Sequence, residues 1–337
     1  MNHEELMLRA INSAKSFKYT AKPNPVVGAI IINKDNEIIS EGYHQFYGQN
    51  HAEINAIESA QKQLGKKFKS FSELTLICTL EPCSHQGKTG SCAEAIVKKD
   101  IRKVIIGAID PNPKVAGKGI KILKDNGVKV KNGLFEDLVE KQNSFFFYKH
   151  KNKKPYITVK IAASSDGKSH YDSNQRVFIT SESSRKDVQK VRANYDAILT
   201  GGNTLRNDNP RMTARVNFPL NQPKKILLTN KTFNKESNFF KNGSVDIFDS
   251  NNLFKIIDFY ADSDICSILV EAGPKLANAF LQTGYVDELI IYTSSNKLGK
   301  KGIDWFYKDN AIENYGFKLE SSYKIDNDIK EIFKKNE

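Results

Sequence analysis

Residues 79–92, Thr-Leu-Glu-Pro-Cys-Ser-His-Gln-Gly-Lys-Thr-Gly-Ser-Cys, decide the fold of the first half of the chain, together with His-Ala-Glu at 51–53. One His and two Cys are three zinc ligands. A catalytic zinc needs such an incomplete shell, because its open fourth position holds a water whose pKa falls toward roughly 7. We therefore predict that His51, Cys83 and Cys92 bind a zinc ion.

The residues around these ligands indicate where helices begin. Asn50 is a candidate N-cap, which would put His51 and Glu53 in the first helical turn, and Ser91 is a candidate cap for a helix that begins at Cys92. The positive helix ends would then face the thiols and favour their deprotonated form. Asn50 and Glu53 also fit a simple capping box, so the interpretation as a metal site depends on the whole set of motifs.

The spacing matches a deaminase signature with one departure. Nucleobase deaminases carry H-x-E followed by P-C-x-x-C, and the Glu of that signature moves protons instead of binding the metal. We predict this catalytic role for Glu53. The two cysteines are separated by the eight residues Ser84 to Ser91 instead of two, so we expect a longer loop that can contact substrate.

The cysteine count bears on the cellular compartment. Four cysteines in 337 residues are too few for a disulfide scaffold and fit a reducing compartment, so we expect a cytoplasmic protein. Cys78 lies within an expected strand and Cys266 at the start of another, and both are interpreted as small buried hydrophobic residues.

Length and charge limit the remaining possibilities. A chain of 337 residues exceeds the usual size of one core, so two domains are expected. The net charge of +12 favours polyanions or phosphorylated small molecules, although scattered lysines can equally form a solvated surface. No apolar run approaches the ~18 residues that cross a bilayer, so we expect no membrane segment.

Hydrophobic periodicity predicts an α/β protein in both halves. The first half predicts the order αββαβαβαβ, which implies a sheet between helices. The basic stretch Lys149 to Pro155 separates the halves, and we place the domains at 1–148 and 149–337. Asn221 to Asp264 predicts no more than one or two strands. The expected strands of the second half are Tyr156 to Ile161, Ala197 to Thr200, Lys225 to Thr229, Ser267 to Glu271 and Glu288 to Thr293, with helices at Ser183 to Arg192 and Pro274 to Gln282.

The first half resembles the bacterial bifunctional riboflavin-biosynthesis deaminase-reductases. The motifs that carry the resemblance are Pro23 to Gly28, Gly42-Tyr43-His44, His51-Ala52-Glu53, Glu81 to Thr89 and Asp110 to Pro113. The resemblance implies a cytidine-deaminase-like three-layer α/β/α domain that hydrolyses the exocyclic amine of a diaminopyrimidine carrying a phosphoribosylamino group. It also implies substrate contacts from Asn24, His44 and Lys88.

The second half shows no G-x-G-x-x-G after a strand, so a Rossmann dinucleotide site is not supported. An apolar strand followed by Gly273 and Pro274 would instead aim free backbone N–H groups of a helix at an anion. Gly201-Gly202 after the strand ending at Thr200 predicts a second loop of close approach.

The resemblance continues through Pro155-Tyr156-Ile157, Lys160, Ala163 to Lys168, Thr204 to Pro210 and Glu271 to Pro274. It implies a dihydrofolate-reductase-like domain in which NADPH reduces the ribosyl group of the deaminated product. The implied NADPH contacts are Ala162, Phe178, Thr204, Asp208 and Gly273. The implied substrate contacts are Arg176, Arg192, Arg215 and Glu271, of which the arginines suit a phosphate dianion.

The sequence departs from the family pattern at two places and leaves two alternative functions open. Phe178 stands where the family often has Trp, and the segment after Tyr292 lacks the customary proline. The alternatives are a tRNA-type deaminase with a basic binding domain, and a deaminase with an inactive reductase-like domain. We favour the bifunctional enzyme, with a phosphorylated pyrimidine substrate, no nucleic acid partner and a homo-oligomeric assembly.

Overall fold

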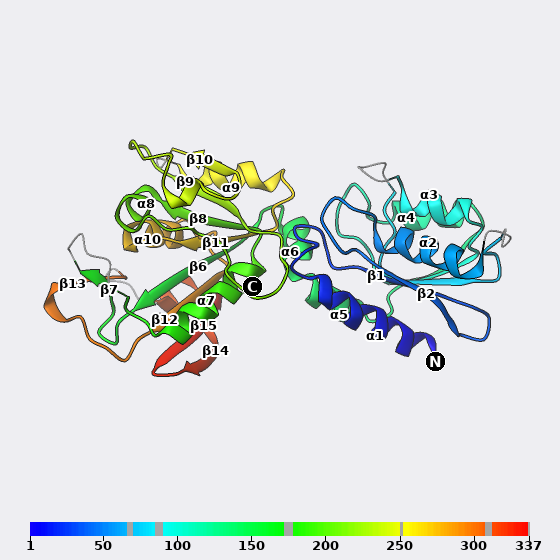
Figure 1. Ribbon diagram of the computed structural model, residues 1–337, viewed down its shortest axis with the longest axis horizontal. Coiled ribbons are helices and arrows are strands. Elements are labelled where there is room, and N and C mark those ends of the chain that lie inside the picture. The colour runs from blue at the N-terminus through cyan, green and yellow to red at the C-terminus, as the bar shows by residue number, and fades with distance from the viewer. Residues whose placement is uncertain (66–69, 85–89, 172–177, 250–251, 307–311, 336–337) are drawn as a thin grey trace. The chain divides into compact units, whose positions relative to one another are not determined.

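The computed structural model describes residues 1–65, 70–84, 90–171, 178–249, 252–306 and 312–335. The chain divides into two compact units, Met1–Asn152 and Lys153–Glu337 (Figure 1). The boundary placed from the sequence, at 148/149, lies inside helix α6 (Ser144–Asn152).

The first unit contains a five-stranded sheet of order β2-β1-β3-β4-β5. β1 is antiparallel to β2 and β3, whereas β3, β4 and β5 run parallel. The predicted order αββαβαβαβ is confirmed, and two helices follow it. The strands are Gly28–Ile32, Ile38–Tyr43, Thr75–Leu80, Lys103–Ala108 and Lys129–Lys131, and the helices before α6 are α1 (His3–Ala14), α2 (Ala52–Leu64), α3 (Cys92–Lys98), α4 (Lys118–Asp125) and α5 (Glu136–Gln142).

Helices cover both faces of this sheet, with α1 and α5 on one face and α2, α3 and α4 on the other (Figure 1). β1 and β3 are therefore buried at every residue, as expected for strands between two helical layers. Two glycines allow the close approach. A Cβ on Gly28 would lie 2.5 Å from the Ala10 carbonyl oxygen of α1, and one on Gly42 would lie 2.2 Å from that of Ala52 in α2.

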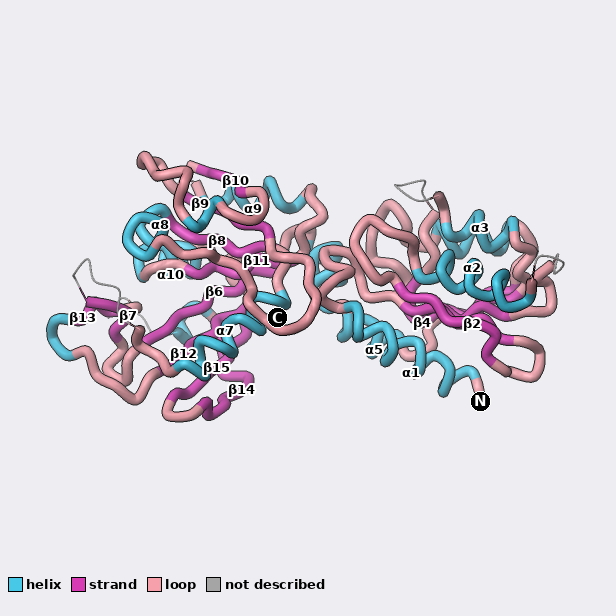
Figure 2. Tube along the Cα trace, viewed as in Figure 1, coloured by secondary structure: helices cyan, strands magenta, loops and turns pink. Residues whose placement is uncertain are grey.

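The second unit contains an eight-stranded sheet of order β10-β9-β8-β11-β6-β12-β15-β14. The strands from β10 to β12 are parallel, and the β14–β15 hairpin adds an antiparallel edge. Figure 2 shows these strands flanked by helices. The strands are Val245–Phe248, Lys224–Leu228, Ala197–Gly201, Ser267–Glu271, Tyr156–Ala163, Glu288–Thr293, Asp328–Lys335 and Phe317–Ile325, in sheet order, and the helices are α7 (Glu182–Asn194), α8 (Gly202–Asp208), α9 (Leu253–Ala261) and α10 (Pro274–Gln282).

Several elements of this unit were not predicted. The polar region Asn221 to Asp264 contains the predicted strand β9 and a second strand, β10, within the one or two strands expected there, but its helix α9 was not predicted. A small ladder pairs β7 (Lys168–Tyr171) with β13 (Gly302–Asp304). Within the described residues, no helix combines the length and the apolar character needed to cross a membrane.

Candidate active sites

The three predicted zinc ligands meet in the first unit. His51 directly precedes α2, Cys83 follows β3, and Cys92 is the first residue of α3. The His51 Nδ1 atom lies 3.6 Å from Cys83 Sγ and 3.3 Å from Cys92 Sγ. All three candidate ligand atoms fall within 4.8 Å of one another, so a single ion could bind them together.

The beginning of α3 stabilises negative charge on Cys83. Ser91 caps the helix by accepting a hydrogen bond from the Glu94 N–H, as predicted. The Cys92 N–H donates to Cys83 Sγ at 3.3 Å. A hydrogen bond from the Cys92 thiol, with a further one from His51, lowers the pKa of Cys83 to about 4, although burial opposes this shift. The same hydrogen bond raises the pKa of Cys92, so Cys83 is the thiol that the fold itself favours as a thiolate ligand.

Glu53 lies in the first turn of α2, beside the ligands. Its side chain is buried at 3% exposure, and burial raises the pKa of this carboxyl group to about 7. The neighbouring His51 opposes the shift. A buried carboxyl group next to the ligands can either hold or release a proton near neutral pH, which is the property a proton carrier needs.

The predicted cap of α2 is wrong by one residue. His51, in extended conformation, occupies the N-cap position, and no side chain caps this end of the helix. The backbone carbonyl of Asn50 instead accepts hydrogen bonds from His44 Nδ1 and Asn55 Nδ2. The chain before the helix is thus held by its neighbours in the fold, and His51 turns toward the thiols from the cap position.

Asn24 and His44 lie next to each other and next to the ligands. The His44 and His51 rings meet edge to face with centroids 5.4 Å apart. His44 Nδ1 must donate to the Asn50 carbonyl, so in the neutral ring Nε2 accepts from the Asn24 amide 3.0 Å away. Burial lowers the pKa of His44, which favours that neutral ring. Lys88, the third predicted substrate contact, lies outside the described residues.

Glu81 is a structural residue of this site that the sequence did not single out. Its buried carboxylate accepts hydrogen bonds from the backbone N–H groups of Asp110, Gly117 and Ile120, at 2.9 to 3.2 Å. These contacts fasten the segment 110–120 beside Cys83, where its Val115 packs against the two thiols. The available signal was a glutamate directly after a mostly apolar strand.

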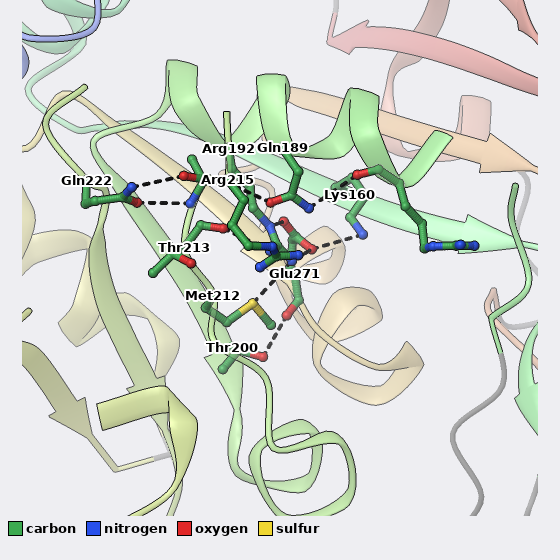
Figure 3. Close-up of polar contacts among 11 residues, drawn as sticks. Lys160, Gln189, Arg192, Thr200, Met212, Thr213, Arg215, Gln222 and Glu271 are labelled. Atoms are coloured by element: carbon green, nitrogen blue, oxygen red, sulfur yellow. Dashed lines mark hydrogen bonds and ion pairs between the residues drawn. The ribbon is translucent and has the colours of Figure 1, made fainter. Parts of the chain in front are cut away.

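A buried ion cluster lies at the end of β11 in the second unit (Figure 3). Arg192 of α7 donates from Nε and Nη2 to the two carboxylate oxygens of Glu271, at 2.6 and 2.8 Å. Lys160 of β6 approaches the same carboxylate at 3.0 Å. Burial alone would raise the pKa of Glu271, but the charges of Arg192 and Lys160 hold it at about 2.

The same cluster holds the segment that carries Arg215. Arg192 also donates to the Thr213 carbonyl and to the Met212 sulfur. The backbone N–H of Arg215 donates to Gln189 on α7, and Figure 3 shows these residues gathered around Glu271. The structure thus brings Arg192, Arg215 and Glu271 into one region. Arg176 lies outside the described residues.

The predicted NADPH contacts lie on several elements. Ala162 is near the carboxyl end of β6, Thr204 and Asp208 belong to α8 after β8, and Gly273 caps α10 after β11. Since β6, β11 and β8 are neighbouring parallel strands, their carboxyl ends share one edge of the sheet, where such folds bind ligands.

Two observations show how accessible this edge is. A Cβ on Gly273 would meet no atom within 4 Å, so the N-terminus of α10 faces open space. Phe178 is 58% exposed, and the Arg185 guanidinium stacks on its ring at 4.5 Å. An exposed aromatic ring and an open helix end fit a planar, anionic cofactor.

Comparisons with known proteins cover both units. Residues 1–108 match a family described as the cytidine and deoxycytidylate deaminase zinc-binding region, and residues 155–330 match the RibD C-terminal domain. The riboflavin biosynthesis protein RibD of Bacillus amyloliquefaciens is 35% identical over 324 residues, covering 88% of this chain and 85% of the relative.

Two solved structures are similar along nearly the whole length. Acinetobacter baumannii RibD gives a TM-score of 0.86 at 34% identity and covers 99% of both chains. A diaminohydroxyphosphoribosylaminopyrimidine deaminase/5-amino-6-(5-phosphoribosylamino)uracil reductase from Thermotoga maritima gives 0.80 at 31% identity, again with 99% of both chains covered. The similarity therefore spans both units.

Proposed function

This chain belongs to the RibD family of bifunctional riboflavin-biosynthesis enzymes, and from that premise we propose how its residues divide the two reactions. The protein is a deaminase and a reductase, with zinc and NADPH as cofactors. The observation that carries the assignment is the meeting of His51, Cys83 and Cys92 beside the buried Glu53. One imidazole nitrogen and two thiol sulfurs are a donor set that fits zinc.

In the deaminase unit, His51, Cys83 and Cys92 hold the zinc. When bound, zinc supplies the Lewis acidity that makes water a nucleophile near neutral pH. The Glu53 carboxylate would accept one proton from the attacking water and donate it to the ring nitrogen, and would then accept the second proton of that water and donate it to the departing amine, which leaves as ammonia. Its burial keeps bulk water from competing for the proton.

The proposed substrate of this unit is 2,5-diamino-6-(5-phosphoribosylamino)pyrimidin-4-one. Asn24, His44 and Lys88 contact it. The hydrogen bond from Asn24 to His44 supports this role, because it fixes the amide with its carbonyl oxygen left as an acceptor for a donor group of the substrate.

In the reductase unit, NADPH binds along the carboxyl edge of β8, β11 and β6. Ala162, Phe178, Thr204, Asp208 and Gly273 contact it. When bound, NADPH supplies a hydride to the ribosyl carbon. The N-terminus of α10 at Gly273 supports the placement, since the open space beside Gly273 lets a phosphate approach the positive end of the helix.

The deaminated pyrimidine binds beside the ion cluster, with Arg176, Arg192, Arg215 and Glu271 as its contacts. The Arg192 side chain is 11% exposed and already forms a bidentate ion pair with Glu271. Its main contribution is therefore to hold Glu271 and the segment 212–215 in place. Arg215 belongs to that segment and is exposed, which supports a direct contact with the substrate phosphate.

The alternatives from the sequence fare differently. The first alternative was a tRNA-type deaminase with a basic binding domain. Residues 155–330 match the RibD C-terminal domain instead, which argues against it. We propose that the chain has no nucleic acid partner. The intact contacts among Lys160, Arg192 and Glu271 favour an active reductase over an inactive one.

We further propose a cytoplasmic homo-oligomer. All four cysteines are buried and none forms a disulfide, which supports a reducing compartment. Leu319 and Tyr323 on the edge strand β14 are 52% and 53% exposed, which supports contact with another copy.

Purified protein with the diaminopyrimidine substrate tests the function directly. Ammonia should appear with or without NADPH, whereas NADPH oxidation should appear only when the deaminated product has formed or is added. Ammonia release without any NADPH oxidation on added product would leave only the alternative with an inactive reductase domain.

A further inference from the structure

The carboxyl ends of β8 and β9 form a junction at one edge of the eight-stranded sheet. These strands are parallel neighbours, with Gly201 paired with Leu228. β8 continues into α8 through Gly201 and Gly202, and β9 ends beside Thr229. Figure 1 shows α8 at the same end of the sheet as α10, whose N-cap is Gly273. The junction therefore adjoins the proposed NADPH edge.

Gly202 brings three groups together at this junction. A Cβ on Gly202 would lie 2.3 Å from Thr229 Oγ1 and 3.0 Å from Arg206 Nη1. Only a residue without a side chain lets this hydroxyl and this guanidinium approach the backbone so closely. The guanidinium of Arg206 and the hydroxyl of Thr229 therefore flank the same short piece of backbone.

Arg206 is oriented without being neutralised. Its Nη2 donates to Asn203 Oδ1 at 2.6 Å, and its Nη1 approaches the Thr232 carbonyl at 3.4 Å. Both partners are uncharged, and no carboxylate pairs with Arg206 in the part of the chain that the structure describes. Lys231, in the turn that Thr229 closes with its hydroxyl, adds a second exposed positive charge.

We propose that Arg206 recognises the 2′-phosphate of NADPH, with Thr229 and Lys231 as secondary contacts, and so makes the reductase prefer NADPH to NADH. A phosphate monoester is a dianion whose oxygens fit the forked donors of an arginine. The Arg206 guanidinium is already held in position by two uncharged acceptors, Asn203 Oδ1 and the Thr232 carbonyl. The inference rests on the proposed position of NADPH along this edge of the sheet.

The position along the edge agrees with the length of the cofactor. The substrate contacts gather around Glu271 on β11, where the nicotinamide must deliver its hydride. β8 and then β9 follow β11 in the sheet, so the junction lies farther from the reaction. The adenosine end of a dinucleotide, which carries the 2′-phosphate, belongs at such a distant position.

The test compares nucleotides that differ only in this phosphate. Calorimetry on the full chain should show that adenosine 2′,5′-bisphosphate binds more tightly than adenosine 5′-monophosphate. Arg206→Ala should remove about tenfold to a hundredfold of that preference, the range of one charge-assisted contact. In kinetics the KM for NADPH should rise by the same factor, with the KM for NADH and the saturated rate unchanged.

Two variants make the result interpretable. Lys324→Ala removes the same charge from β14, at the opposite edge of the sheet, and should leave both constants unchanged. Lys231→Ala should have the same effect as Arg206→Ala but smaller. If Arg206→Ala keeps the full preference for the 2′-phosphate, or weakens NADPH and NADH equally, the inference is wrong. A wild-type protein that binds and oxidises neither cofactor would instead refute the proposed function of this unit.

Discussion

The two sites of this protein are built in contrasting ways. The deaminase site places four chemically distinctive side chains at the ends of β3, α2 and α3, where three ligand atoms lie within 4.8 Å. The proposed reductase site is spread along one edge of a sheet, and the contacts that we propose for the cofactor come from several elements, glycines and helix ends among them. A metal site can be recognised in the sequence from a few residues, because few residue types bind metals. A site for an extended cofactor is harder to recognise, because its contacts come from many elements.

The largest expected effect breaks the metal site itself. Cys83→Ser and Cys92→Ser should each reduce zinc from about one per chain to almost none, because both thiols belong to the same small cluster. Deamination should disappear with the metal, and the first unit should melt at lower temperature because metal binding is coupled to folding. Metal analysis and differential scanning calorimetry measure both effects.

Cys78→Ser and Cys266→Ser are the matched controls. Both cysteines are buried, but neither belongs to the cluster. They should keep the full zinc content. Equal loss of zinc from all four variants would contradict the choice of ligands.

The next effect separates metal binding from proton transfer. Glu53→Gln should keep the zinc and lose about a hundredfold to ten-thousandfold in the rate of deamination, the usual contribution of a general acid-base residue. Glu58→Gln changes an exposed glutamate on the same helix and should alter neither property. Loss of zinc from Glu53→Gln would assign the residue to the metal shell instead.

A smaller effect concerns the stability of the reductase unit. Glu271→Gln leaves Arg192 and Lys160 buried without their counter-charge, which should reduce the free energy of unfolding by about 3–5 kcal/mol. Reductase activity should fall with it, while ammonia release persists. Urea denaturation followed by tryptophan fluorescence reports this unit, because Trp305 lies in its core.

The pH dependence of that stability has a definite sign. The pKa of Glu271 is about 2 in the folded protein and 4.5 when unperturbed, so its stabilising contribution is complete above pH 4.5. The contribution should be lost as the pH falls from 4.5 toward 2. Glu182→Gln, on the exposed side of α7, should keep this acid sensitivity, and a Glu271→Gln variant that also keeps it would show that another group is responsible.

The sequence predicted which residues meet in the first unit, His51, Cys83 and Cys92, because His, Cys and Glu at that spacing have few other uses. The cap at Ser91 also follows from local chemistry alone. The cap of α2 did not, because tertiary contacts from His44 and Asn55 hold the Asn50 carbonyl and leave His51 as the cap. Helix-capping preferences do not anticipate such partners, which lie six and five residues from Asn50 and depend on how the loop before the helix folds.

The elements of the second unit were harder to predict from the sequence. Helix α9 lies in a region rich in Lys and Asn, where apolar periodicity is weak outside the helix itself. The β14–β15 hairpin carries many charged residues because β14 is an exposed edge strand. Lys160 and Glu271 form part of a buried pair only because β6 and β11 are neighbours, which one strand cannot reveal.

The central claim is that the two chemistries use separate residues in separate units, and one measurement tests it most directly. Ammonia release and NADPH oxidation are followed side by side in His51→Ala and Arg215→Ala, with each substrate supplied independently. His51→Ala should lose ammonia release and still oxidise NADPH on added 5-amino-6-(5-phosphoribosylamino)uracil. Arg215→Ala should release ammonia normally and lose about tenfold to a hundredfold in reductase efficiency. Loss of reduction in a folded His51→Ala protein, or normal reduction in Arg215→Ala, would contradict the claim.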